Sequence, residues 1–392
     1  MSNLVVPFSR PVVAPEASSA LERVLGSGWM TTGPECAAFE EEFAAWVGAR
    51  HAAAVSSCTA ALEIALRGLR LPRGSRVLVP TITFCGVVEA VVHAGLVPVL
   101  TDVDPETGLA TPGTTAAAAR DCGGADALLV LHYAGHPVDV AALADAAGLP
   151  LSRVVEDAAH ALGTWVGDQQ VGSISRATCF SFYATKNLPI GEGGMITTDD
   201  EELDGWVRST RLHGMSRDAW RRYLPGGAWR YSVEQDGLKA NLSDVHAAIG
   251  RTGLRHLADW QRRRAEVTAR YAQGLADVPG LALPPAPARG RHAWHLYPVR
   301  VRPGFPMSRD ALAAHLGDRG IGTSVHFIPI HHLPYLRSVS VLPASGLAGA
   351  DALFAELLSL PMSAGLADDE VDAVCAAVLD AASRHQHVEV SR

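Results

Sequence analysis

The sequence predicts an α/β protein with a mostly parallel sheet that is covered by helices on both faces. Between about residues 50 and 200, short β-branched runs such as RVLVP and ALLVL alternate with alanine- and leucine-rich helical stretches. These runs are apolar along nearly their whole length, which is typical of strands buried on both sides. With 392 residues, 48% of them hydrophobic, the chain is long enough for two domains with a substantial core.

The expected elements follow one another in a regular order. RVLVP precedes the helical CGVVEAVVHAG, and VPVLTDVD and ADALLVLHYAG supply the next strands. The helical VDVAALADAAG precedes the strand in SRVVEDAAHALG, and the strands in ATCFSFYATK and GGMITTDD complete the series. Ligands of such sheets bind beyond the carboxyl ends of the strands, so the residues that follow each strand are candidates for a site.

The segment from Leu203 to Asp236 lacks clean periodicity, and we expect it to be irregular and either functional or mobile. Its arginines are candidates to contact a diphosphate, because a guanidinium fork matches phosphate geometry. A solvated basic loop is the alternative for each of them. The arginines concerned are Arg217, Arg221, Arg222 and Arg230.

A domain boundary is expected near residue 250. NLSDVHAAIG begins a helix with Asn241 or Ser243 as its cap, and the apolar residues from Leu254 to Tyr271 lie on one side of a long helix. The proline-rich LPPAPARGRHAWH then opens a smaller α/β portion. We therefore divide the chain into residues 1–250, with an N-terminal segment and a large domain, and residues 251–392, a small C-terminal domain.

The composition excludes several classes of protein. The net charge is −8 with no long basic stripe, so a nucleic-acid partner is not expected. Six scattered cysteines without a CxxC pair fit a reducing cytosol and suggest neither disulfides nor a structural zinc site. The longest apolar stretch, GVVEAVVHAGLVPVL, is interrupted by Glu89, His93 and Pro98, and the N-terminus is no signal peptide. We expect a cytoplasmic protein that does not enter a membrane.

Lys186 lies at the centre of FSFYATKNLPIGEGG, directly after a short aromatic strand. Some thirty residues earlier, the strand in VVEDAAHALG ends in Glu156 and Asp157. A lysine at one strand end and a buried acid at another suit pyridoxal 5′-phosphate (PLP): the lysine forms a Schiff base, and the acid keeps the pyridine nitrogen protonated. If each residue is considered alone, the alternative for Lys186 is a solvated loop residue and the alternative for Asp157 is a helix N-cap.

A third element favours the cofactor reading over these alternatives. In SSCTAALEIAL, the hydroxyls of Ser56, Ser57 and Thr59 follow a small-residue strand and open a helix. Hydroxyls and free backbone N–H groups at a helix N-terminus form an anion site, here a candidate phosphate site. A capping box between Thr59 and Glu63 is the simpler alternative. Three such elements in order along one α/β chain predict a PLP site.

The chain resembles the DegT/DnrJ/EryC1/StrS aminotransferases, the sugar branch of fold-type-I PLP enzymes. The resemblance covers nearly the whole length, and its motifs are SSCTAAL, VPTITF, DVDPETG, VEDAAHALG, FSFYATKNLPIGEGG, GLKANLSDVHAAIG, WHLYPV and GTSVHFIPIHHLP. It implies a large domain with a mostly parallel seven-stranded sheet, followed by the smaller C-terminal α/β domain. It also implies a homodimer whose active sites lie at the subunit interface.

The resemblance implies a role for each matching position. Lys186 carries the Schiff base and Asp157 pairs with the pyridine nitrogen. The remaining cofactor contacts implied are His160 near the ring hydroxyl, Phe84 stacked on the ring, and Thr59, Ala60, Ser181 and, from the neighbouring subunit, Asn241 at the phosphate. For the nucleotide-sugar, the implied contact is His326, and Arg230 and Lys239 are further candidates to bind it.

The implied reaction moves an amino group from L-glutamate to a nucleotide-linked (dTDP) 4-keto-6-deoxyhexose, with the pyridoxamine 5′-phosphate (PMP) form as intermediate. Alternatives within the family are a 3-keto-sugar or a keto-cyclitol as acceptor. A protein that binds the cofactor or the nucleotide-sugar as a sensor is the alternative of another class.

Two further positions leave alternatives open. Cys58 stands where the family usually has glycine: it is strained if this residue needs a positive φ, and harmless if it does not. His326, His331 and His332 resemble a metal cluster by composition, but their spacing suits no common zinc pattern, so no metal is expected.

Overall fold

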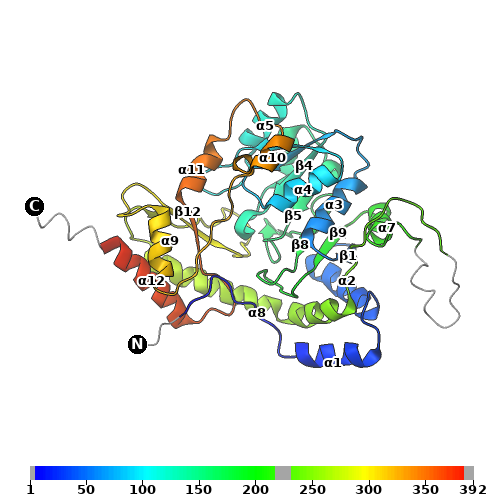
Figure 1. The fold of residues 1–392 in the computed structure, drawn as a ribbon, viewed down its shortest axis with the longest axis horizontal. Coiled ribbons are helices and arrows are strands. Elements are labelled where there is room, and N and C mark those ends of the chain that lie inside the picture. The colour runs from blue at the N-terminus through cyan, green and yellow to red at the C-terminus, as the bar shows by residue number, and fades with distance from the viewer. Residues whose placement is uncertain (1–4, 217–230, 384–392) are drawn as a thin grey trace, which may run out of the picture.

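The computed structural model describes residues 5–216 and 231–383. A seven-stranded sheet forms the centre of the larger part (Figure 1). Its pairs are parallel from β8 to β3, whereas β9 runs antiparallel to both of its neighbours, β1 and β8. The mostly parallel seven-stranded sheet is therefore confirmed. In spatial order the strands are β1 (His51–Val55), β9 (Gly194–Thr198), β8 (Ala177–Ser181), β5 (Val154–Asp157), β4 (Ala127–Leu131), β2 (Arg76–Pro80) and β3 (Val97–Thr101).

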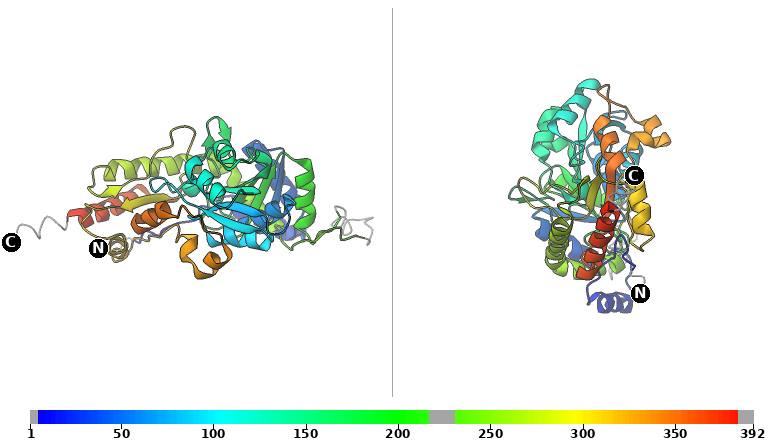
Figure 2. Two further views of the ribbon diagram at one scale, coloured as in Figure 1. Left: turned by 90° about the horizontal axis from the view of Figure 1, so that it is seen from above. Right: turned by 90° about the vertical axis from the view of Figure 1, so that its left-hand side faces the viewer.

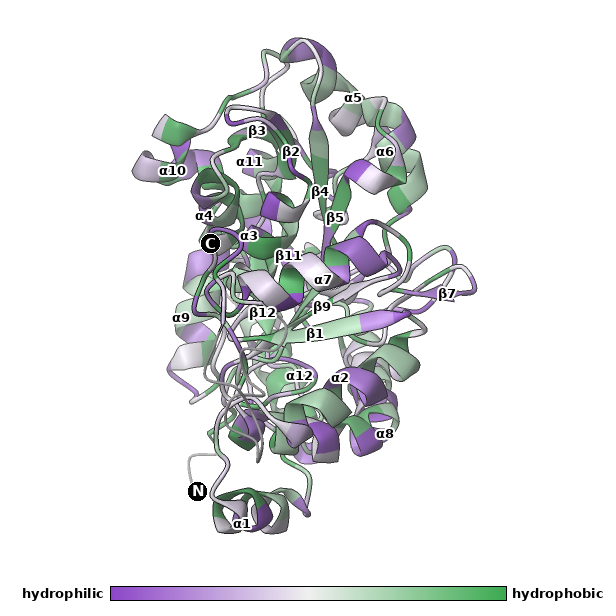
Figure 3. Ribbon diagram, turned by 90° about the vertical axis from the view of Figure 1, so that its right-hand side faces the viewer, coloured by the Kyte–Doolittle hydropathy of each residue, from purple (hydrophilic) through white to green (hydrophobic). Residues whose placement is uncertain are grey.

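Helices cover both faces of this sheet because successive side chains of each strand point to opposite sides. In β2, Val77 and Val79 pack with α3 and α4, whereas Leu78 packs with α5 and α6. The strand β4, with the sequence ALLVL, is hydrophobic along its length (Figure 3). The helices of this part are α2 (Pro34–Val47), α3 (Cys58–Gly68), α4 (Cys85–His93), α5 (Pro112–Asp121), α6 (Val140–Ala147) and α7 (Glu201–Thr210).

Helix α7 corrects one expectation. Its residues from Leu203 onward belong to the segment predicted to be irregular, but Asp200 caps the helix by accepting from the Leu203 N–H, and Leu203 and Val207 are buried on one face. That part of the prediction is wrong. The arginines proposed for a diphosphate, Arg230 among them, lie outside the described residues.

The smaller part holds an antiparallel sheet in which β11 lies between β10 and β12. A second core surrounds it, filled by α9, α12 and the latter part of α8. The elements of this part are β10 (Leu281–Ala282), β11 (Tyr297–Val301), β12 (Leu357–Leu360), α9 (Arg309–Gly317) and α12 (Asp368–Ser383). Two helices of the C-terminal region pack on the large part instead. Leu336 of α10 (Pro334–Val339) lies in the core with α3 and α4, and Ala350 and Leu353 of α11 (Ala348–Glu356) lie in the core with α5 and α6. The described residues also include a short hairpin, β6 (Trp165–Val166) and β7 (Gln169–Gln170), the helix α1 (Ala17–Ser27), and 3₁₀ turns at Tyr133–Gly135, Leu151–Arg153 and Ile330–His332.

Helix α8 (Asp244–Leu275) is shared by the two parts. Ser243 caps its start by accepting from the His246 N–H. Leu254 and Leu257 pack in the core under the large sheet, whereas Val267 and Tyr271 pack in the small core. The helix runs along one side of the molecule and joins both parts (Figures 1 and 2). It passes through residue 250 without interruption, and the division into residues 1–250 and 251–392 stays a prediction.

Within the described ranges, no helix has both the length and the hydropathy to cross a membrane.

Candidate active site

A cavity of about 590 Å³ opens where β5 and β8 end and where α3 and α4 begin. Most of the residues expected to form the site line it: Thr59, Phe84, Asp157, His160, Ser181, Lys186 and His326. The sheet edge predicted from the strand order is thus the edge that carries the cavity.

Lys186 reaches this cavity from a tight turn after β8, where its backbone N–H donates to the Tyr183 carbonyl over 2.8 Å. Burial lowers the pKa of its amine to about 8, against the opposing effect of the nearby Asp157 carboxylate. A lowered pKa increases the fraction of neutral amine near pH 7, and the neutral amine is the nucleophile.

Asp157 ends β5 and is only 3% exposed. Its Oδ1 accepts a hydrogen bond of 2.9 Å from the Ala159 N–H. Burial raises the pKa of this carboxyl group, and Lys186 acts in the opposite direction. A buried carboxylate with spare acceptor capacity favours a cationic N–H partner, such as a protonated pyridine.

The N-terminus of α3 forms a third wall. Ser57 caps the helix by accepting from the Ala60 N–H at 3.1 Å, and Ser57, Cys58 and Thr59 line the cavity. Ala60 does not line it. Gly194 of β9 allows this close packing, since a Cβ there would lie 2.6 Å from the Ser57 carbonyl carbon.

Cys58 is the first residue of α3, and it is not among the residues with positive φ. Its place in the family motif therefore requires no left-handed backbone, and cysteine is tolerated without strain. Its thiol lies 3.8 Å from Asp157 Oδ1 and 3.5 Å from the Cys179 carbonyl oxygen. Burial raises the pKa of the thiol well above its usual value, so Cys58 is no thiolate nucleophile.

Three histidines with lowered pKa values face the cavity. Burial lowers the pKa of His160 and His295 well below the usual value and that of His326 to about 4. His160 Nδ1 accepts from the Ala134 N–H at 3.3 Å, and His326 Nδ1 lies 3.0 Å from Ser359 Oγ. These histidines are neutral at pH 7, so they offer hydrogen bonds without adding positive charge beside Lys186.

Phe84 precedes α4 and is 56% exposed, with its ring centroid 6.1 Å from that of Phe327. An aromatic side chain exposed at a cavity is available to stack on a planar ligand.

Asn241 and Lys239 do not line this cavity. The Lys239 amine donates to Asn241 Oδ1, and Asn241 Nδ2 donates to Thr32 Oγ1 over 2.6 Å. The structure therefore does not place Asn241 or Lys239 at the cavity of their own chain, and a role in a neighbouring subunit stays a prediction.

Several lining residues were missed by the sequence analysis: Phe8, Ser9, Tyr183, Glu192, His295, Ser324 and Met362. Tyr183, Glu192, His295 and Ser324 lie within the quoted family motifs and were open to inference from them. The other three come from segments outside those motifs.

His331 and His332 form a cluster with Asp351 of α11 rather than with His326. Both imidazoles bond to Asp351 Oδ1, at 2.9 and 2.8 Å, and His331 Nδ1 lies 2.8 Å from Thr81 Oγ1. The three side chains are close enough to hold a metal ion in principle. Shared hydrogen bonds between Ile330–His332 and α11 account for the geometry without one, and the absence of a metal stays a prediction.

The residues present fit PLP. A lysine amine of lowered pKa and a buried carboxylate share one cavity with a hydroxyl-rich helix N-terminus, and no other described cavity combines these groups. On a mostly parallel sheet, these parts define a PLP-dependent transferase.

Comparison with known proteins identifies the family. Residues 12–379 match the DegT/DnrJ/EryC1/StrS aminotransferase family, and the chain belongs to it. It is a PLP-dependent sugar aminotransferase of fold type I.

Individual relatives agree over nearly the whole chain. The spore coat polysaccharide biosynthesis protein SpsC of Bacillus subtilis is 42% identical over 381 residues, which cover 96% of this chain and 97% of SpsC. The structure of DesV from S. venezuelae is 36% identical, with a TM-score of 0.84 and 94% of both chains covered. The sugar aminotransferase Spr1654 of Streptococcus pneumoniae, in its PMP-form, is 27% identical with a TM-score of 0.88, covering 97% of this chain and 99% of that one; its PLP-form is also known.

Proposed function

We propose that the enzyme transfers the amino group of L-glutamate to C4 of a dTDP-linked 4-keto-6-deoxyhexose, giving a 4-amino-4,6-dideoxy sugar for secondary-metabolite or polysaccharide glycosylation in the cytoplasm. The observation that carries the transfer is the joint placement of Lys186 and Asp157 in one cavity. Support for the C4 position is the similarity of HGMSRDAWRRY and GTSVHFIPIHHLPY to members that aminate C4.

PLP, when bound, supplies an electron sink and carries the amino group between the two substrates. Lys186 holds the cofactor and, once released, moves the proton at the donor Cα as general base. Asp157 holds a proton at the pyridine nitrogen through a charge-assisted hydrogen bond, worth roughly 1.5–3 kcal/mol.

The other residues bind and orient. Thr59 of α3 and Ser181 of β8 would contact the phosphate through their hydroxyls. Ala60 follows Thr59 on α3. His160 donates to the ring hydroxyl from Nε2, since its Nδ1 accepts from Ala134. Phe84 stacks on the ring.

The acceptor contacts His326 of the subunit in whose cavity it binds. We propose that the enzyme is a homodimer in which Asn241 reaches the phosphate of the neighbouring subunit, while Lys239 and Arg230 contact the nucleotide-sugar. Asn241 and Lys239 lie together outside their own cavity, which supports this arrangement.

The test follows absorbance of the holoenzyme on addition of L-glutamate and then of dTDP-4-keto-6-deoxyglucose, with mass spectrometry of the products. Formation of 2-oxoglutarate and then of the amino sugar supports the proposal. If the enzyme converts a 3-keto isomer or a keto-cyclitol instead, that compound is the acceptor and the proposed 4-keto sugar is not. No reaction with any amino donor would favour the sensor alternative.

A further inference from the structure

The N-terminal segment from residue 5 to residue 12, here called the strap, contributes to the cavity wall. Phe8 and Ser9 line the cavity beside His326 and Phe327. The Phe8 ring stacks on the His326 ring, with centroids 5.2 Å apart and planes 25° apart. The strap therefore lies beside His326, the residue proposed to contact the acceptor.

Backbone hydrogen bonds hold the strap in place on both sides of Phe8. The Val6 N–H donates to the Gly320 carbonyl at 2.9 Å, and the Gly322 N–H donates to the Val6 carbonyl at 2.8 Å. The Met362 N–H donates to the Phe8 carbonyl at 3.2 Å. Gly322 permits this approach, since a Cβ there would lie 2.6 Å from the Phe8 nitrogen. The Val6 side chain is buried in the small core.

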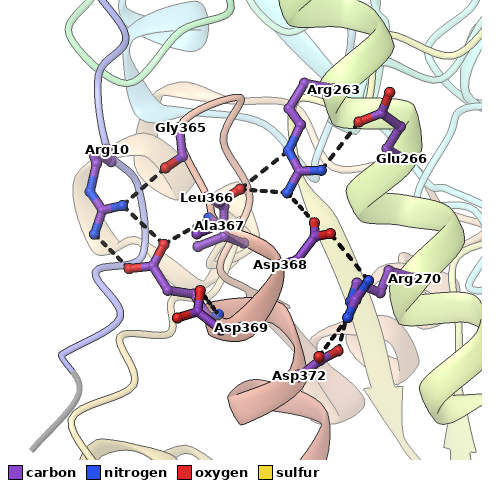
Figure 4. Close-up of polar contacts among 11 residues, drawn as sticks. Arg10, Arg263, Glu266, Arg270, Gly365, Leu366, Ala367, Asp368, Asp369 and Asp372 are labelled. Carbon is purple, nitrogen blue, oxygen red and sulfur yellow. Dashed lines mark hydrogen bonds and ion pairs between the residues drawn. The ribbon is translucent and has the colours of Figure 1, made fainter.

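Arg10 fastens the end of the strap to α12 (Figure 4). Its two terminal nitrogens donate to the two carboxylate oxygens of Glu370, at 2.9 and 2.7 Å, and one also donates to the Gly365 carbonyl at 2.9 Å. A guanidinium fork on a carboxylate fixes orientation as well as distance. In the same cluster Arg270 pairs with Asp372 and Asp368, which joins α8 to α12 without contacting the strap.

We propose that Phe8 determines acceptor specificity and that Arg10 is the positioning residue that holds it. Phe8, Phe327 and Met362 form an apolar side of the cavity next to the neutral His326. The matching ligand feature is the apolar C5–C6 edge of a 6-deoxy sugar, whereas L-glutamate is charged at both ends and gains nothing from an apolar wall. This inference rests on the proposed function.

The half-reaction with the keto-sugar and the half-reaction with L-glutamate can be measured separately, which distinguishes an effect on acceptor binding from an effect on the amino donor. Phe8→Ala is expected to raise the KM for dTDP-4-keto-6-deoxyglucose about tenfold, the size of effect that the loss of one apolar contact has. The ratio of kcat/KM for this sugar to kcat/KM for its 6-hydroxy analogue is expected to fall as well. The half-reaction with L-glutamate is expected to keep its rate. Phe8→Tyr keeps the ring and restores the KM.

Arg10→Gln is expected to raise the same KM with little change in kcat, and Arg10→Lys, which keeps the charge but loses the fork, restores it only in part. Arg270→Gln removes an ion pair of the same cluster and leaves both half-reactions unchanged. If the wild type aminates the sugar and Phe8→Ala matches it in KM and preference, the role of the strap is overturned. A wild type that reacts with L-glutamate but never with the sugar overturns the proposed acceptor, and the strap's role with it.

Discussion

Lys186 and Lys239 are the only lysines of the chain, so the residue that holds the cofactor is easily identified. Lys186→Ala removes the amine and the proposed general base together. We expect turnover to fall at least ~10³-fold, which corresponds to over ~4 kcal/mol of activation free energy. Borohydride reduction of the holoenzyme followed by peptide mass mapping should place the cofactor on Lys186. A label on Lys239, or near-wild-type turnover of the variant, contradicts the assignment.

The pKa of Lys186 predicts a pH dependence in the cofactor-free protein. Burial lowers this pKa from the ordinary 10.5 to about 8, so the amine is protonated below pH 8 and neutral above it. Only the neutral amine attacks an aldehyde. The rate of cofactor uptake is therefore expected to rise through pH 8 and level off above it. Stopped-flow absorbance across this range checks the inflection, and a rise that continues toward pH 10.5 would contradict it.

The residues of the site differ in how far the sequence predicts them. Lys186, Asp157, Thr59 and Ser181 each follow a strand or open a helix, so local pattern places them at one sheet edge, where the structure has them. Phe8 and Met362 reach the same cavity through packing between segments some 350 residues apart. No local pattern carries that information.

At the level of single elements, α3 supplies both a helix cap and a wall of the site. Ser57→Ala removes the cap and is expected to cost about 1 kcal/mol of unfolding free energy. Because Ser57 also lines the cavity, affinity for PLP should fall as well. Ser308, which caps α9 by accepting from the Ala311 N–H at 3.2 Å, is the matched control.

Ser308→Ala should lose similar stability and keep the wild-type affinity for PLP. Urea denaturation and a cofactor titration of both variants make the comparison. Equal affinity for PLP in the two variants would show that the Ser57 side chain does not contribute to the phosphate site.

The strands were predictable because most are short, largely apolar runs between turn residues, as in ALLVL of β4. Helix α7 was missed since its sequence, EELDGWVRST, is mostly polar, and its apolar face consists of a few residues that pack on α3. For α8, periodicity predicted the helix but not that two cores would share it, because the same apolar face serves both.

For the whole molecule, the proposed dimer predicts complementation between two defective subunits. Lys186→Ala disables its own site, whereas Asn241→Ala is expected to impair the site of the neighbour. Random mixing of the two variants gives half heterodimers with one intact site each, so about a quarter of wild-type activity should return. Two copies of a doubly substituted chain give the baseline. Coexpression with distinct tags and an activity assay decides, and no recovery in isolated heterodimers would place Asn241 in its own site.

The attachment of the strap also bears on the order of events during synthesis. Val6, Phe8 and Arg10 leave the ribosome before the residues of the sheet, whereas their partners lie between Gly320 and Glu370. The sheet and Lys186 are complete long before those partners emerge. A nascent chain therefore has the residues for the cofactor side of its cavity first, and it can close the opposite wall only after Glu370 has been synthesised.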